Sequence, residues 1–542
     1  MDPVASANQP LSGVGDLQGL HVVHNGEIYN FRKLYAELEA DGYTGKPRTQ
    51  SDSEVIMHCY KHWGAERTVQ KLRGMFAFVL VDEINRDYLV ARDHVGIKPL
   101  YHGRNNAGDQ GFSSELKVLW DQFQDLVLFQ PGRYGTKNGE MRFYEPIWDI
   151  PDYVPASFSS HELVRRELKQ AVRLRMMSDV PFGALLSGGL DSCIVTSLMI
   201  EISKEEMAAA KARGETGEAW YTFHNGGVLK TFTVGMEGSP DIMAARAMSQ
   251  ALGSDHYERL FEPEEGFGLI RKVVYHMETY EPELIRSSIT NYMLAELTAK
   301  HVKTVVTGEG ADEPFCGYQY FKDAPTAAAL QEESRRIYHH LHCVNLQRSD
   351  RMGMAHSLEA RVPFLDVEFL QVAFSVDPAL RMIGADGIEK KFLRDAFADH
   401  TPIPRELLYR TKAMQCEGVG MDWVSMLQRD IEANMSDAHL EEAQLKYKIN
   451  PPQSKEECLY RDLFQEFFPG LDRFVHVWEG GCRAGGASWK SSAYTRFGLC
   501  DVNSLKHGLM SETDMSSANW PNKRQRTPCR TVSDPGFTHD LP

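Results

Sequence analysis

The sequence has no apolar run long enough to span a bilayer, and its first dozen residues lack the basic start and apolar stretch of a secretion signal. We therefore expect a cytoplasmic protein that does not contact a membrane. Its nine cysteines include no CxxC pair. This spacing, the odd number and a reducing compartment argue against a disulfide framework and against a zinc site.

An excess of positive charge is also missing. The formal net charge is -16, and most basic residues alternate with acidic ones instead of forming a stripe. Such a surface repels a nucleic-acid backbone. The composition therefore excludes nucleic acid as the expected partner and favours chemistry on small molecules.

The pattern of the chain changes twice along its 542 residues. Residues 1–150 alternate short apolar runs with turn-forming pairs, which predicts a sheet-rich α+β domain. Residues 151–480 combine helical periodicity with short strands that end in Gly or Ser, which predicts a parallel α/β sheet. Residues 481–542 are rich in Ser, Gly, Asn and Thr, which predicts a disordered tail.

The strongest local signal is SGGLDS, Ser187 to Ser192, between the apolar run VPFGALL and a helical run. Two adjacent glycines allow a tight turn, and a helix N-terminus behind them attracts an anion. Asp191 fits two interpretations, a helix cap or a ligand of Mg²⁺. The segment is not a Walker A loop, because the GK[ST] ending is absent.

A second apolar strand ends in TGEGADE, Thr307 to Glu313. Its acids fit a capped helix N-terminus or, together with Asp191, the carboxyl edge of the sheet, where ligands of open α/β sheets bind. Hard oxygen ligands suit Mg²⁺, so Asp191 and Asp312 could share one metal ion at the phosphates.

SGGLDS resembles the pyrophosphate loop of the N-type ATP pyrophosphatases, which split ATP between the α- and β-phosphates and transfer AMP to an acid. Three further segments follow TGEGADE in order, namely SLEARVPFLD, IEKKFLR and RTKAMQCEGVG. Together the five motifs resemble asparagine synthetases of the glutamine-dependent type. The resemblance implies an α/β, adenine nucleotide alpha hydrolase-like (PP-loop) synthetase domain that uses ATP and Mg²⁺ to convert aspartate, through β-aspartyl-AMP, into asparagine, AMP and pyrophosphate.

The same resemblance implies individual roles. Glu309 would support formation of the adenylate, and Lys390 would neutralise charge that grows on the α-phosphate, a task suited to a fixed cation. The implied ATP-binding residues are Leu185, Ser187, Gly188, Gly189, Asp191, Ser192, Val234, Thr307 and Gly308.

The segments HNGEIYN, SDSEV, LRGMFAF and ARDHVGIKPLY resemble, in this order, a class II glutamine amidotransferase domain of the Ntn type. The resemblance implies that Asn25 and Gly26 form an oxyanion hole and that Glu27 and Asp52 bind the amino group of glutamine. It also implies an N-terminal cysteine nucleophile. Because residue two is an aspartate and Cys59 lies in a predicted helical core, we expect an incomplete domain and regard glutamine hydrolysis as doubtful, with ammonia as the other nitrogen donor.

Two departures affect the predicted amino-acid pocket. Asn345 stands where the family's more familiar members have an acidic residue, although Arg348 is retained, and METYEPELIRSS differs from the usual substrate loop. Two alternatives to aspartate amidation therefore stay open, a related ligase that acts on another acid and a non-catalytic paralogue. The resemblance also allows a homodimer.

Overall fold

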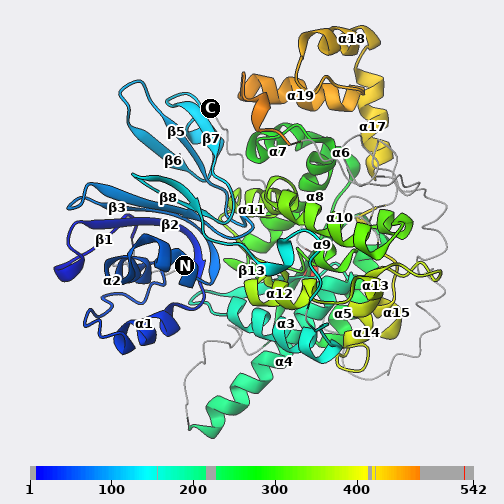
Figure 1. Cartoon of the computed structure of the whole chain (residues 1–542). Coiled ribbons are helices and arrows are strands. Elements are labelled where there is room, and N and C mark those ends of the chain that lie inside the picture. Colours follow the sequence, from blue (N-terminus) through cyan, green and yellow to red (C-terminus); the bar gives the residue numbers. More distant parts are fainter. Residues whose placement is uncertain are drawn as a thin grey trace.

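The structure, a computed structural model, describes residues 8–155, 157–214, 228–412, 418–420 and 423–476, and the backbone of Arg530–Thr531. The predicted disordered tail, apart from that short strand, lies outside the described residues. Figure 1 shows two main parts, an N-terminal sheet domain and a helix-rich second domain. Across the described ranges, every helix is too short or too polar to cross a membrane.

The N-terminal domain contains an antiparallel six-stranded sheet in the order β1-β2-β3-β4-β8-β9 and a three-stranded sheet in the order β6-β5-β7. Side chains of β2 and β3 alternate between the core and the other face, as expected for antiparallel strands. The core of this domain packs α1 and α2 against the large sheet. The bounds are β1 Leu11–Ser12, β2 Leu20–Ile28, α1 Phe31–Ala40, α2 Glu54–Lys71, β3 Gly74–Asp82, β4 Asp87–Arg92, β5 Tyr101–Arg104, β6 Gln110–Ser113, β7 Gln124–Leu128, β8 Arg133–Thr136 and β9 Gly139–Arg142.

The second domain is built on a parallel sheet in the order β14-β13-β10-β11-β12-β15. The three predicted apolar strands form β10, β11 and β13, so the predicted parallel α/β sheet is confirmed. The strands are β10 Phe182–Leu185, β11 Lys230–Gly235, β12 Asp255–Leu260, β13 Thr304–Val306, β14 Glu359–Arg361 and β15 Arg530–Thr531.

Helices cover both faces of this sheet. One hydrophobic core packs α3, α4, α5, α12 and α14 against one face, and a second core packs α7, α8, α17 and α19 against the other. The main helices are α3 His161–Arg175, α4 Leu190–Ala212, α5 Pro240–Leu252, α7 Ile270–Met277, α8 Pro282–Ala299, α9 Asp312–Phe315, α10 Ala327–His340, α11 Asn345–Met354, α12 Val367–Phe374, α14 Lys391–Phe397, α17 Trp423–Asn434, α18 Asp437–Lys446 and α19 Lys455–Phe467.

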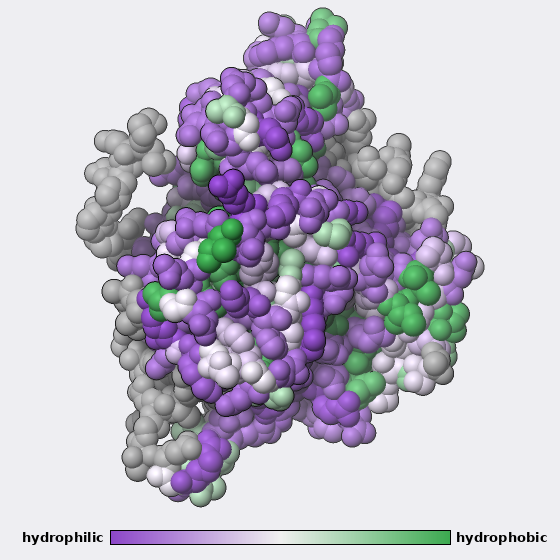
Figure 2. All heavy atoms as spheres, turned by 60° about the vertical axis from the view of Figure 1, so that its left-hand side comes forward, coloured by the Kyte–Doolittle hydropathy of each residue, from purple (hydrophilic) through white to green (hydrophobic). Residues whose placement is uncertain are grey.

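The strand order brings the two predicted ligand-binding motifs together at the carboxyl ends of the strands. The central strand β10 has β11 on one side and β13 on the other, so the chain turns to opposite sides after it. Such a switch point opens a crevice at the carboxyl ends of the strands. SGGLDS follows β10 and TGEGADE follows β13, and the two motifs therefore meet at this crevice. The surface in Figure 2 is mostly hydrophilic, with separate hydrophobic patches.

Candidate active site

The SGGLDS motif forms the loop between β10 and α4 and the first turn of α4, and this loop is called the phosphate loop below. Gly188 has a φ of +72°, and a Cβ there would lie 2.4 Å from Cβ of Ala244 in α5, so both the backbone conformation and the space require glycine. The Ser192 hydroxyl donates to the carbonyl of Gly189 at 2.9 Å. Helix α4 begins after Gly189 with no side-chain cap, so Asp191 does not act as the helix cap. The N-terminus of α4 is thus available to an anion.

Lys390 lies between two carboxylates at the strand ends. Its ammonium forms ion pairs with Asp191 and, at 2.7 Å, with Asp312. Burial alone would lower the pKa of Lys390, but the two carboxylates outweigh burial and raise it. Burial alone would raise the pKa of Asp312, but Lys390 and Lys412 hold it well below its usual range. Lys390 and Asp312 are therefore both charged at neutral pH.

The oxygen donors of Asp191 and Asp312 suit the Mg²⁺ ion predicted there. Both residues offer carboxylate oxygens, and Oδ1 of Asp191 is buried and accepts no hydrogen bond from the described residues. Buried carboxylate oxygens normally have a partner. An oxygen of this kind beside a phosphate loop is a suitable ligand for Mg²⁺.

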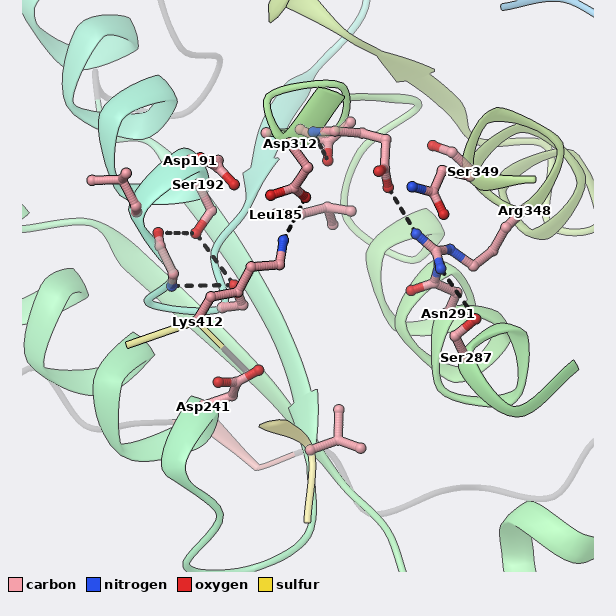
Figure 3. Close-up of a pocket in the computed structure, with 18 of the residues that line it drawn as sticks. Leu185, Asp191, Ser192, Asp241, Ser287, Asn291, Asp312, Arg348, Ser349 and Lys412 are labelled. Carbon is pink, nitrogen blue, oxygen red and sulfur yellow. Dashed lines mark hydrogen bonds and ion pairs between the residues drawn. The ribbon is translucent and has the colours of Figure 1, made fainter. Parts of the chain in front are cut away.

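Two cations at this end of the pocket received no role from the sequence. Lys412 forms an ion pair with Asp312, and Arg410 donates to Asp241 at 2.6 Å. Figure 3 shows Lys412 reaching toward Asp312 near the phosphate loop. Both residues belong to the motif RTKAMQCEGVG. Its RxK spacing is the sequence signal that could have identified them as site residues.

The other end of the pocket lies near α8 and α11. Arg348 donates to Glu309 at 3.0 Å and to the Ser287 hydroxyl at 3.1 Å. Asn345 donates to the hydroxyl of Tyr318 at 2.8 Å. In Figure 3, Ser287, Asn291, Arg348 and Ser349 lie together across the pocket from Asp191 and Lys412. The pocket thus has a phosphate end and a polar second end that also carries the predicted catalytic Glu309.

Almost all of the predicted synthetase residues line this one pocket. The exception is Gly188, which faces α5 and gives the loop its shape. The predicted residues in the wall are Leu185, Ser187, Gly189, Asp191, Ser192, Val234, Thr307, Gly308, Glu309, Asp312 and Lys390.

The predicted glutamine-binding residues form a separate group on β2 and the segment before α2. Asn25 donates to the Ser114 hydroxyl at 3.0 Å, and Oδ2 of Asp52 accepts from the backbone N–H of Ile28 at 2.6 Å. Gly26 has a φ of +134°, and a Cβ there would lie 1.9 Å from a backbone oxygen of β3. The structure therefore brings Asn25, Gly26 and Asp52 into one neighbourhood.

Glu27, the fourth predicted glutamine-binding residue, is buried at the boundary between the domains. Arg361 of β14 donates to it at 2.8 Å and to Glu359 at 2.6 Å. Burial raises the pKa of Glu27 to about 7, although Arg361 opposes this shift. The backbone carbonyl of Arg361 accepts from the N–H of Thr307 at 3.0 Å. Arg361 therefore contacts both predicted sites.

Cys59 lies in α2 with no exposed surface, and burial raises the pKa of its thiol to about 12. A buried thiol that stays protonated is a poor nucleophile. The prediction that Cys59 belongs to the core of this domain is confirmed.

The parallel sheet, the glycine loop and the charged residues at its switch point define an α/β protein with a crevice whose chemistry suits a phosphate group. Comparison with protein families matches "Asparagine synthase" to residues 163–329 and 322–489, and "Glutamine amidotransferase domain" to residues 1–128. The chain belongs to the asparagine synthase family, a family of ligases, and carries an amidotransferase domain of the Ntn type before the synthase domain.

Two asparagine synthetases are similar to this chain over most of their length. Asparagine synthetase [glutamine-hydrolyzing] 2 of Oryza sativa subsp. japonica is 39% identical over 86% of this chain and 77% of its own length. Asparagine synthetase B of Escherichia coli (strain K12) is 40% identical over 83% of this chain and 80% of its own length. Among solved structures, glutamine phosphoribosylpyrophosphate amidotransferase from B. subtilis matches with a TM-score of 0.23 and 18% identity, over 48% of this chain and 65% of that one.

Proposed function

We propose that the pocket uses ATP to activate aspartate as β-aspartyl-AMP and that ammonia then displaces AMP to give asparagine. The observation that carries this proposal is the position of Lys390 between the strand-end carboxylates of Asp191 and Asp312, beside the glycine loop. A cation held there can stabilise the negative charge that develops when ATP is cleaved between its α- and β-phosphates.

The phosphate end of the pocket would bind the pyrophosphate leaving group. The N-terminus of α4 would bind the β- and γ-phosphates, with Lys412 and Arg410 as further cations. Mg²⁺, held by Asp191 and Asp312, would neutralise phosphate charge when it is bound. Lys390 would contact the α-phosphate. Its two carboxylate partners fix the ammonium in place, so little reorganisation is needed as the reaction proceeds.

The second end of the pocket accounts for the acid. Arg348 supplies a guanidinium that can pair with a carboxylate, and Glu309 holds that guanidinium in place at 3.0 Å. The acceptor carboxylate would attack the α-phosphorus, and pyrophosphate would leave. Ammonia would then attack the acyl carbon, AMP would leave with the C–O bonding pair, and the surplus proton would pass to solvent.

The experiment is pyrophosphate release from ATP and Mg²⁺ with aspartate, measured with ammonium and, separately, with glutamine. We expect aspartate-dependent release that disappears in Asp191→Ala and persists in Asp399→Ala, an exposed aspartate of the same domain. Release with ammonium alone would agree with the doubt about glutamine hydrolysis, and release with both donors would remove that doubt. Release that does not depend on aspartate would contradict the proposal.

A second candidate is amidation of a different acid. The observation that favours it is the neutral Asn345 in the wall of the second end, where it donates to Tyr318. Replacing a carboxylate by an amide changes the charge offered to the substrate. A panel of amino and carboxylic acids in the same assay separates the two candidates, because only the true acceptor stimulates pyrophosphate release.

A further inference from the structure

Three side chains with different donor atoms meet between α18 and α19, the two helices at the top of Figure 1. Cys458 and Asp462 are four residues apart on α19, so they share one face of the helix. His439 comes from the first turn of α18. The donor atoms of His439, Cys458 and Asp462 all lie within 4.8 Å of one another.

We propose that His439, Cys458 and Asp462 bind a divalent cation of the zinc class. One imidazole nitrogen, one thiolate and one carboxylate form a donor set that suits Zn²⁺ or Co²⁺ better than Mg²⁺. A thiolate and a carboxylate together carry the two negative charges that balance a divalent ion. Water would complete four-coordination.

The distances are close to those that a metal requires. The Cys458 Sγ to Asp462 Oδ2 distance is 3.7 Å, and the His439 Nε2 to Asp462 Oδ2 distance is 2.7 Å. Ligands around a tetrahedral Zn²⁺ lie roughly 3.3 to 3.8 Å apart, as follows from metal–ligand distances of about 2.0 to 2.3 Å. The contact between His439 and Asp462 has to widen to reach this range. The exposed side chain of His439 gives it room to do so.

A neighbouring tyrosine orients the carboxylate. The hydroxyl of Tyr447 donates to Oδ1 of Asp462 at 2.6 Å, so Oδ2 is the oxygen that faces Cys458 and His439. Hydrogen bonds of this kind fix metal ligands in other proteins. Cys458 packs with Tyr447 and Ala443 in a small hydrophobic cluster, which holds the thiol in position.

Cation binding to the thiol would release one proton and needs no other reactant. A free cysteine thiol carries its proton at neutral pH. The cation would replace that proton, which leaves to solvent as the sulfur–metal bond forms. No oxidant or reductant is involved.

The site is distinct from the pocket of the proposed synthetase reaction, because no residue of α18 or α19 lines that pocket among the described residues. Its ligands come from two helices and lack the CxxC spacing by which zinc sites are recognised in a sequence. A bound cation would join α18 to α19 and stabilise this pair of helices.

The test is titration of the whole chain, stripped of metal by a chelator, with Co²⁺ alone. A cobalt–thiolate bond gives a near-ultraviolet charge-transfer band. We expect this band to saturate at about one equivalent and to disappear when Zn²⁺ is added. His439→Ala should raise the dissociation constant for Co²⁺ at least tenfold, Tyr447→Phe should raise it about tenfold, and Cys458→Ser should abolish the band.

His400→Ala, a change at an exposed histidine outside the cluster, should leave the titration unchanged. If Cys458→Ser does not fold, the exposed His439→Ala variant decides the question. The proposal is overturned if the parent chain gives no thiolate band, if the band persists in folded Cys458→Ser, or if His439→Ala binds Co²⁺ with the affinity of the parent.

Discussion

Charge in the proposed phosphate end is concentrated in a few side chains, and two of them, Lys390 and Lys412, share the carboxylate of Asp312. Sharing one anion leaves each ammonium partly available to another anion. A pyrophosphate leaving group would provide it, and Lys412 is therefore expected to contribute to catalysis as well as to the stability of the site.

We predict that Lys412→Met lowers kcat for pyrophosphate release about 100-fold, as is typical when one charge-stabilising donor is removed. Lys391→Met is the matched control, because Lys391 is about half exposed and pairs only with surface carboxylates among the described residues. Steady-state assays of both variants check this. Equal activity of Lys412→Met and the parent would show that Lys412 has no catalytic part.

Sequence reasoning found Lys390 but not Lys412, Arg410 or Asp241. Lys390 belongs to a motif whose role the family resemblance implies. The contacts of the other residues join positions far apart in the chain, 100 residues for Lys412 with Asp312 and 169 for Arg410 with Asp241. Such pairs form only when the whole domain folds, so the RxK spacing points to the two cations but not to their partners.

The raised pKa of Glu27 predicts how glutamine binding depends on pH. Burial raises the pKa of Glu27 to about 7 and that of Asp52 to about 6, while Arg361 opposes both shifts. A protonated carboxyl cannot pair with the ammonium of glutamine, and that ammonium stays charged in this range. We therefore expect glutamine binding to strengthen as the pH rises from about 6 to 8, with the steepest change near 7.

Calorimetric titration with glutamine across this pH range measures the effect. Glu27→Gln should weaken binding and remove most of the pH dependence. Binding that is equally strong at pH 6 and pH 8 would mean that the Glu27 carboxylate does not bind the amino group.

At the scale of elements, the loop between β10 and α4 is the part most sensitive to small changes. Gly188→Ala would add a Cβ at 2.4 Å from Ala244 and force an alanine into the left-handed region. We predict a loss of about 1–3 kcal/mol in the free energy of unfolding and weaker ATP binding.

Gly189→Ala is the matched control, because its Cβ would meet only the flexible hydroxyl of Ser187, at 3.3 Å, and its φ of -73° suits any residue. Chemical unfolding of both variants gives the comparison of stability, and nucleotide titration of Gly188→Ala measures the loss of ATP binding. The explanation fails if the two alanines have the same effect on stability.

The strands were predicted unevenly. Apolar runs that end in small residues identified β10, β11 and β13, and their pairing agrees. Strands β12 and β14 were not identified, because Asp255–Leu260 and Glu359–Arg361 are rich in charged residues. Those charges are satisfied by partners elsewhere in the fold, for example Glu258 by Arg246 at 2.8 Å. The tertiary structure therefore overrides the local polar pattern.

At the scale of the whole molecule, buried ion pairs join the two domains. Lys98 of the N-terminal domain pairs with Asp350 of α11 at 3.0 Å, and both side chains are buried. Arg73 of the same domain reaches Asp366, which also pairs with Arg175. The same helix α11 carries Arg348 into the pocket. The contact between domains therefore supports the helix on which the second end of the pocket depends.

We predict that Lys98→Met lowers the free energy of unfolding by about 3–5 kcal/mol, because Asp350 would remain buried without its cation. Lys137→Met should cost under about 1 kcal/mol, since Lys137 and Asp87 form a more exposed pair within one domain. Urea unfolding of both variants tests this. A similar small loss in both would show that the Lys98 pair contributes little to the joining of the domains.

The family assignment and the two-domain fold were predicted from ordered motifs, whereas the domain boundary near residue 151 stays a prediction. The contacts between domains could not be predicted. Arg361, for example, reaches Glu27 across 334 positions of sequence. The composition of neither segment indicates such a contact, because a buried charge and a solvated charge look the same in a sequence.

The central claim is that the pocket joins an acid to AMP before nitrogen is added. The most direct test uses aspartate labelled with oxygen-18 in its β-carboxylate, with ATP, Mg²⁺ and ammonium, and mass spectrometry of the nucleotide product. The account predicts AMP that carries one labelled oxygen, transferred from the acid when the adenylate is broken. Unlabelled AMP, or ADP as the product, would contradict it.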